Sequence, residues 1–223
     1  MRIDILTLFP EMFIPLEKSI TGRAVKSAKL EINIINIRDF SKDKHKKCDD
    51  YTFGGGPGML MMPQPIYDAI TSIPGYENAR KIYMSPKGEK FSQNKSVELS
   101  KYNHLIILCG HYEGVDQRVL DLLIDEEISI GDYVLTGGEL PAMVVVDAVS
   151  RHIDGVLHSG ESTEIESFEN GLLEYPQYTK PREFMGLSVP EVLISGDHKK
   201  VDEWRKEQAE KLTLERRPDI MKK

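Results

Sequence analysis

Short apolar segments that alternate with helical patterns restrict the fold of this 223-residue chain more than any other feature. Strand patterns occur at 2–8, 31–37, 81–84, 104–109 and 126–130. Helical patterns lie between them, at 21–26, 66–73 and 97–99. Strands that alternate with helices in this way form parallel sheets whose faces the helices cover. We therefore predict an α/β fold with a parallel sheet.

The valine-rich segment 139–151 fits either a strand or a helix by residue propensity. Pro141 suits the first turn of a helix, and the run is too long for one strand, so we predict a helix. Residues 158–170 are polar and acidic and show no apolar period. We expect a linker or a mobile active-site loop there.

A second helical region follows this polar segment. Residues 195–197 form an N-terminal cap for a helix whose apolar face carries Val201, Trp204, Gln208 and Leu212. Most basic side chains of this helix fall on other faces. We therefore predict a small, basic, helical domain from about residue 171 onward.

The charge balance limits how this chain can bind a polyanion. Lysine and arginine number 29 against 36 aspartates and glutamates, which gives a formal net charge of −7. A sequence-wide attraction to nucleic acid is excluded, so binding would need local basic patches. These patches lie at 42–47, 199–200, 205–206, 216–217 and 222–223. A charge run is usually a solvated surface, so the patches alone decide nothing.

Neither the apolar segments nor the cysteine content indicates secretion or membrane insertion. No uncharged apolar run approaches the roughly 18 residues that cross a bilayer, and Asp4 interrupts the N-terminal hydrophobic stretch. Cys48 and Cys109 are too few for a disulfide scaffold and lack metal-ligand spacing. We expect a cytoplasmic protein without membrane contact and without a zinc site.

Glycine-rich segments are the candidate ligand-binding elements. Residues 53–59 hold four glycines but match neither a Walker loop nor a dinucleotide fingerprint, so a plain surface turn stays open beside a phosphate cradle. Residues 109–114 and 130–141 each place glycines directly after a strand. Because open α/β sheets bind ligands at the carboxyl ends of their strands, these two bends predict one cleft. Its apolar walls, from Ile130, Val134 and Leu135, suit a flat ring such as adenine.

Taken together, the motifs resemble the bacterial tRNA (guanine-N1)-methyltransferases of the TrmD family, a branch of the SPOUT methyltransferases. The resemblance runs almost the whole chain, and its specificity comes from many motifs in one order. They include 8–13, 21–25, 38–40, 54–60, 85–86, 109–114, 125–127, 129–135, 137–142, 171–173, 178–181 and 216–219.

This resemblance implies a SPOUT-type parallel sheet with a C-terminal trefoil knot, an exception to the rule of unknotted chains. It implies a homodimer that binds S-adenosylmethionine (SAM) and tRNA. The implied domains are a methyltransferase domain at 1–157, a flexible active-site linker at 158–170 and a helical tRNA-binding domain at 171–223. The implied SAM site comprises Tyr83, Met84, Ser85, Pro86, Gly110, Tyr112, Glu113, Ile130, Gly131, Asp132, Tyr133, Val134, Leu135, Gly137, Gly138 and Pro141.

The family reaction assigns roles to two charged residues. Guanine N1 carries a proton, so a base must remove it before N1 can attack the methyl group, and charge then spreads toward O6. By position, Glu166 matches the family's aspartate base, and Arg151 matches the arginine that would stabilise O6. Glu164 or Glu169 stays open as the base because Glu166 is one methylene longer. Arg151 is otherwise explained by a helical ion pair with Asp147.

The expected substrate is the guanosine at tRNA position 37, beside the anticodon. A divalent cation such as Mg²⁺ assists the family, although the sequence shows no dedicated ligand set. His111 stands where many relatives carry arginine. Two alternatives stay open: a SPOUT RNA-binding protein with impaired catalysis, and a methyltransferase for another RNA base.

Overall fold

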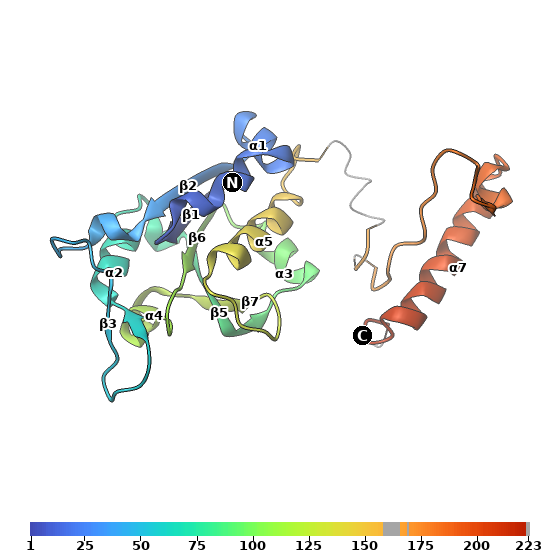
Figure 1. Ribbon diagram of the computed structural model, residues 1–223. Coiled ribbons are helices and arrows are strands. Elements are labelled where there is room, and N and C mark those ends of the chain that lie inside the picture. Colours follow the sequence, from blue (N-terminus) through green and yellow to red (C-terminus); the bar gives the residue numbers. More distant parts are fainter. Residues whose placement is uncertain (158–165, 169, 222–223) are drawn as a thin grey trace. The chain divides into compact units, whose positions relative to one another are not determined.

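The computed structural model describes residues 1–157, 166–168 and 170–221 (Figure 1). The chain divides into two compact units, Met1–His158 and Ser159–Lys223. The first unit holds the main sheet and most helices, and the second holds one long helix and a short hairpin.

A five-stranded parallel sheet forms the centre of the first unit, which confirms the predicted α/β class. Its strand order is β2-β1-β6-β5-β7, and every neighbouring pair is parallel (Figure 1). The strands are β1 (Arg2–Thr7), β2 (Glu31–Asn36), β5 (Arg80–Lys90), β6 (His104–Cys109) and β7 (Glu126–Ser129). The predicted segments therefore fall on these strands. β5 is longer than its apolar pattern because residues after a bulge pair again with β7.

Four helices lie between strands of this sheet in the sequence, and a fifth, α5, follows β7. They are α1 (Ser19–Lys26), α2 (Pro63–Thr71), α3 (Gln93–Leu99), α4 (Gln117–Leu123) and α5 (Glu139–Ser150). Short 3-10 helices lie at η1 (Pro10–Glu17), η2 (Ile37–Phe40) and η3 (Tyr76–Asn78). α5 confirms the helix predicted for the valine run, with Pro141 in the first turn, where its missing N–H leaves no helical hydrogen bond unmade.

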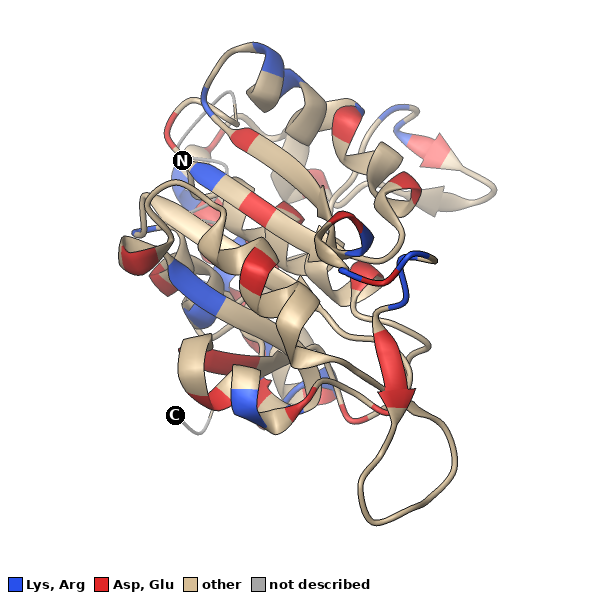
Figure 2. Cartoon of the chain, turned by 90° about the vertical axis from the view of Figure 1, so that its left-hand side faces the viewer, with Lys and Arg blue, Asp and Glu red and all other residues tan. Residues whose placement is uncertain are grey.

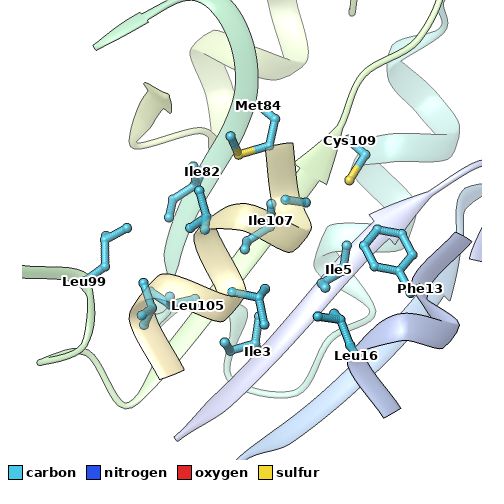
Figure 3. Packing of buried hydrophobic residues seen from close by; sticks show 14 of the residues in the cluster. Ile3, Ile5, Phe13, Leu16, Ile82, Met84, Leu99, Leu105, Ile107 and Cys109 are labelled. Atoms are coloured by element: carbon cyan, nitrogen blue, oxygen red, sulfur yellow. The ribbon is translucent and has the colours of Figure 1, made fainter. Parts of the chain in front are cut away.

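Two hydrophobic clusters sit on opposite faces of the sheet. Side chains from β6 alternate between them: Leu105 and Ile107 join the cluster with α5, and Ile106 joins the cluster with α2 and α4. Figure 3 shows the first cluster, where strand side chains meet α5 and η1. Because both faces are covered, the strands are apolar on both sides, which explains why the sequence shows apolar runs.

A glycine-rich hairpin projects from this unit. Its strands β3 (Asp49–Tyr51) and β4 (Met59–Met61) are antiparallel. Four glycines between them have positive φ angles, and Phe53 is fully exposed. At its base, Met61 N donates a hydrogen bond to Gly114 O at 3.0 Å. The hairpin is therefore anchored to the loop that follows β6.

The second unit contains β8 (Glu183–Phe184), β9 (Leu187–Ser188), η4 (Glu191–Ile194) and the long helix α7 (His198–Arg216). α7 confirms the helix predicted after residue 197, where Asp197 caps Lys200 N at 3.2 Å. Ala209 and Thr213 are its most buried residues. The predicted linker at 158–170 lies largely outside the described residues. Among the described helices, none is both long and apolar enough to span a membrane.

Candidate functional site

A cavity of about 300 Å³ opens at the carboxyl ends of β6 and β7 and beside residues 83–87 in the middle of β5. Every residue of the predicted SAM site lines it except Asp132, whose exposed carboxylate pairs instead with Lys90 Nζ at 3.1 Å. The cavity is also lined by residues outside the predicted SAM set, of which His111, Gly114 and Thr136 lie within the two predicted bends: Leu60, Lys87, His111, Gly114, Val115, Gln117, Leu120, Glu127, Ile128, Ser129 and Thr136. Most of these are chain neighbours of the glycine motifs.

Close backbone approach explains why glycines stand at the two strand exits. A Cβ atom on Gly110 would lie 2.7 Å from Tyr83 Oη, and one on Gly138 would lie 2.8 Å from Cys109 Cα. Gly138 N also donates a hydrogen bond to Gly110 O at 2.9 Å. The structure therefore brings the bends at 109–114 and 130–138 together, as the sequence analysis expected.

The cavity combines apolar walls with few polar groups. Ile130, Leu135 and Pro141 contribute apolar surface, whereas Val134 lies at the rim and is 82% exposed. Burial, together with the nearby Glu127 charge, raises the pKa of Tyr83 to about 12, so its hydroxyl keeps its proton at neutral pH. Glu127 Oε2 is buried and has no hydrogen-bond partner within the described part of the chain. An acceptor of this kind in a cavity wall suits a ligand that brings a donor.

The two residues assigned to catalysis do not line this cavity. Arg151 directly follows α5 in the first unit and is half-buried. Glu166 belongs to the second unit, where it lines a separate pocket of about 250 Å³ with Tyr175 and Arg205. There the Arg205 guanidinium lies 5.1 Å from the Tyr175 ring centroid. The alternative bases Glu164 and Glu169 lie outside the described residues.

The basic patch at 42–47 is largely neutralised by neighbouring carboxylates. Lys46 Nζ lies 2.6 Å from Asp39, and Lys42 and Lys47 each lie 3.5 Å from an aspartate. Figure 2 shows lysine and aspartate side by side in this loop and an acidic β3 strand after it. The local positive charge of this patch is therefore lower than its sequence suggests.

The residues that the structure describes contain no preformed metal-binding cluster. No group of three or more His, Cys, Asp or Glu side chains is placed there to hold an ion.

A parallel sheet with a cavity at its carboxyl edge, lined by backbone turns and a few apolar side chains, is typical of α/β proteins that bind nucleotide-like ligands. A family model described as tRNA (guanine-1)-methyltransferase TrmD matches residues 1–223. The chain therefore belongs to this family.

Curated relatives agree over the full length. A protein named tRNA (guanine-N(1)-)-methyltransferase from Clostridioides difficile is 56% identical, and the match covers 100% of this chain and 98% of that protein. Proteins of the same name from Caldanaerobacter subterraneus and Staphylococcus aureus are 58% and 53% identical. Those matches cover 100% of this chain and 92% and 91% of the two relatives.

Proposed function

We infer that this protein transfers a methyl group from SAM to N1 of the guanosine at position 37 of tRNA. Membership of the family and the names of the full-length relatives support the reaction. The single observation that carries the inference is the cavity, because the residues matched to the family's SAM site converge on it from three strands.

The described residues fit SAM as the methyl donor. Glycines at 110 and 138 let the two strand exits pack closely enough to line one cavity, and apolar walls at Ile130 and Leu135 suit an adenine ring. The unpartnered Glu127 Oε2 suits a hydroxyl or amino donor of the ligand. When bound, SAM supplies an electrophilic methyl group on a sulfonium. Mg²⁺ remains part of the proposal as an assisting ion without an assigned site.

Glu166 serves as the base in the proposed reaction, and Arg151 stabilises charge on O6. A carboxylate is needed because N1 must lose its proton before its lone pair can attack. A guanidinium is suited to the oxygen because it remains charged and presents several donors. The transfer is a direct displacement, so no side chain forms a covalent intermediate.

A second copy of the chain completes the proposed enzyme. Apolar side chains on α5 and η1 support a homodimer because they are exposed in a single copy, among them Leu140, Val144 and Ile14. We further propose that the chain of the sheet unit is threaded into a trefoil knot. The bridge between His111 and Gly137 and the Gly138–Gly110 hydrogen bond support this, since they hold two separate loops against each other.

The remaining parts of the chain have proposed roles as well. Residues 1–157 form the methyltransferase domain and 171–223 a domain that grips tRNA; the linker predicted at 158–170 lies largely outside the described residues. Exposed cations on α7, such as Lys199 and Lys206, support phosphate contacts by this domain. The enzyme acts in the cytoplasm, where its substrate is found.

A methyl-transfer assay on total tRNA tests the function. With labelled SAM, nucleoside analysis should find 1-methylguanosine, and a tRNA whose guanosine 37 is replaced should remain unlabelled. Label on another nucleoside would indicate another target base. Binding of SAM without transfer would indicate a catalytically impaired RNA-binding protein.

The base assignment is tested by Glu166→Gln, which removes the proton acceptor and nearly preserves shape. The single-turnover rate should fall by about a hundredfold or more, while affinity for S-adenosylhomocysteine (SAH) stays unchanged because Glu166 does not line the cavity. Glu166→Asp should retain activity. Glu191→Gln, an exposed carboxylate of the same unit, is the matched control. An unchanged rate in Glu166→Gln would reject the assignment.

A further inference from the structure

Glu139 is a buried carboxylate behind the cavity, at the first residue of α5. Its side chain is only 1% exposed and does not line the cavity. Thr7 Oγ1 donates a hydrogen bond to Glu139 Oε1 at 2.6 Å. His111 Nε2 lies 2.8 Å from Oε1 and 2.7 Å from Oε2. Both carboxylate oxygens therefore have close partners.

These three residues come from separate parts of the sheet unit. Thr7 ends β1, His111 follows β6, and Glu139 begins α5. Gly137 packs against both side chains, since a Cβ atom there would overlap His111 Cε1 and lie 2.6 Å from Glu139 Oε2. The Glu139 carboxylate thus lies where both glycine-bearing strand exits meet the end of β1.

The electrostatics of Glu139 favour a charged side chain at neutral pH. Burial raises its pKa, but the hydrogen bonds from His111 and Thr7 outweigh burial and hold the pKa below its ordinary value. Burial also raises the pKa of the adjacent Cys109 thiol, and the Glu139 charge raises it further. Removing one partner of a buried charged pair is costly because the other is left uncompensated.

His111 connects this buried group to the cavity. Its ring lines the cavity, and its backbone forms an antiparallel bridge with Gly137. The neighbouring Tyr112, also in the lining, has a positive φ of 59°, which ordinary residues seldom adopt. A backbone held in this conformation needs support from its surroundings.

We propose that Glu139 is a positioning residue: through His111 and the turn at 137–138, it holds the two strand exits in the geometry that binds the methyl donor. This inference rests on the proposed function. Glu139 does not touch the donor, and its effect is carried by the residues that do.

Calorimetric titration with SAH tests the proposal first in Glu139→Gln. The dissociation constant should rise by about tenfold to a hundredfold, as expected for loss of a charge-assisted hydrogen bond. The matched control is Glu126→Gln. Glu126 is also a poorly exposed carboxylate, with Arg80 Nε at 2.7 Å and Lys95 Nζ at 3.2 Å, but it does not line the cavity or contact His111. The substitution Glu126→Gln should lower thermal stability and leave SAH affinity unchanged.

Thr7 provides a second test that leaves the Glu139 charge in place. Thr7→Val removes the hydroxyl donor with little change in shape and should weaken SAH binding by about threefold to tenfold. Thr7→Ser keeps the hydroxyl and should bind as the wild type does. In steady-state assays, KM for SAM should rise with the SAH dissociation constant, while kcat at saturating SAM changes by about threefold at most.

The outcomes separate this inference from the proposed function. If the wild type binds SAH and Glu139→Gln and Thr7→Val bind it equally well, the positioning role is wrong and the proposed function stands. Equal losses of affinity in Glu126→Gln would also overturn the role, since they would reflect general destabilisation. If the wild type shows no heat with SAH, the proposed function fails and this inference fails with it.

Discussion

Replacing Gly138 with alanine should weaken SAH binding by pushing the two strand exits apart. The backbone of Gly138 has φ −82° and ψ −5°, which alanine adopts without strain, so the effect is purely steric. The new Cβ would lie 2.8 Å from Cys109 Cα and 2.9 Å from Gly110 N. These are backbone atoms, so a side-chain rotation cannot relieve the contact.

The expected magnitude follows from this overlap. Overpacking of a well-packed site costs about 1–3 kcal/mol. If separation of the exits relieves the strain, the hydrogen bond from Gly138 N to Gly110 O at 2.9 Å also lengthens. A loss of 1–3 kcal/mol in binding corresponds to about a fivefold to 150-fold higher dissociation constant. Calorimetry with SAH measures it directly.

Gly75→Ala is the control for general loss of stability. Gly75 has a positive φ of 78°, and a Cβ there would meet nothing within 4 Å, so the substitution strains the backbone without a steric clash. Its cost is about 1–3 kcal/mol, which lowers the melting temperature of the same unit. SAH affinity should not change. If Gly138→Ala bound SAH as tightly as the wild type, the close approach of the two exits would be refuted.

Three further predictions concern charge. The Glu139 pKa is lowered in the folded chain, so this carboxylate stabilises the fold above its ordinary pKa of 4.5. The stabilisation is lost as pH falls through the lower folded-state pKa. The unfolding free energies of the wild type and Glu139→Gln, measured by chemical unfolding, should therefore converge in acid. Asp4→Ala should cost about 3–5 kcal/mol of unfolding free energy, because this fully buried carboxylate has three partners, yet leave SAH affinity unchanged. The logarithm of the tRNA association constant should fall linearly with the logarithm of salt concentration. Lys199→Ala or Lys206→Ala should reduce this slope more than Lys46→Ala, because Lys46 already pairs with an aspartate. Filter-binding titrations over a salt series measure these slopes.

The central sheet could be predicted from sequence because its strands are buried on both faces. Such strands form short apolar runs, which predict β6 and the first part of β5, whereas apolar and polar residues alternate at the start of β1. The second part of β5 could not be recognised. Residues 85–90 include a proline, a glycine and charged side chains, and the long-range pairings of Glu89 with Ile128 and of Lys90 with Ser129 make them a strand. Helix α4 was missed because its apolar face is short.

The cavity could be predicted to a similar extent, for a related reason. Glycines directly after strands are a local signal, and the carboxyl-end rule for parallel sheets converts that signal into a common location. Thr7 and Glu139 carry no such signal. They are 132 positions apart, and neither a threonine nor a glutamate at a helix start indicates a buried hydrogen bond. Only the fold, which places the end of β1 against α5, brings them together.

The rim of the cavity is harder to predict from sequence than its glycine-bearing bends. The sequence suggested Val134 as an apolar wall, and it does line the cavity, but most of its surface faces solvent in the single copy. Tyr133 and Tyr112 are also substantially exposed there. Exposure of apolar side chains to water is unfavourable, so a second surface that covered the mouth of the cavity would stabilise them. Neither the proposed base nor the proposed arginine belongs to the lining. In the proposed reaction, donor binding is therefore encoded within the sheet unit, whereas the proposed base Glu166 comes from the second unit.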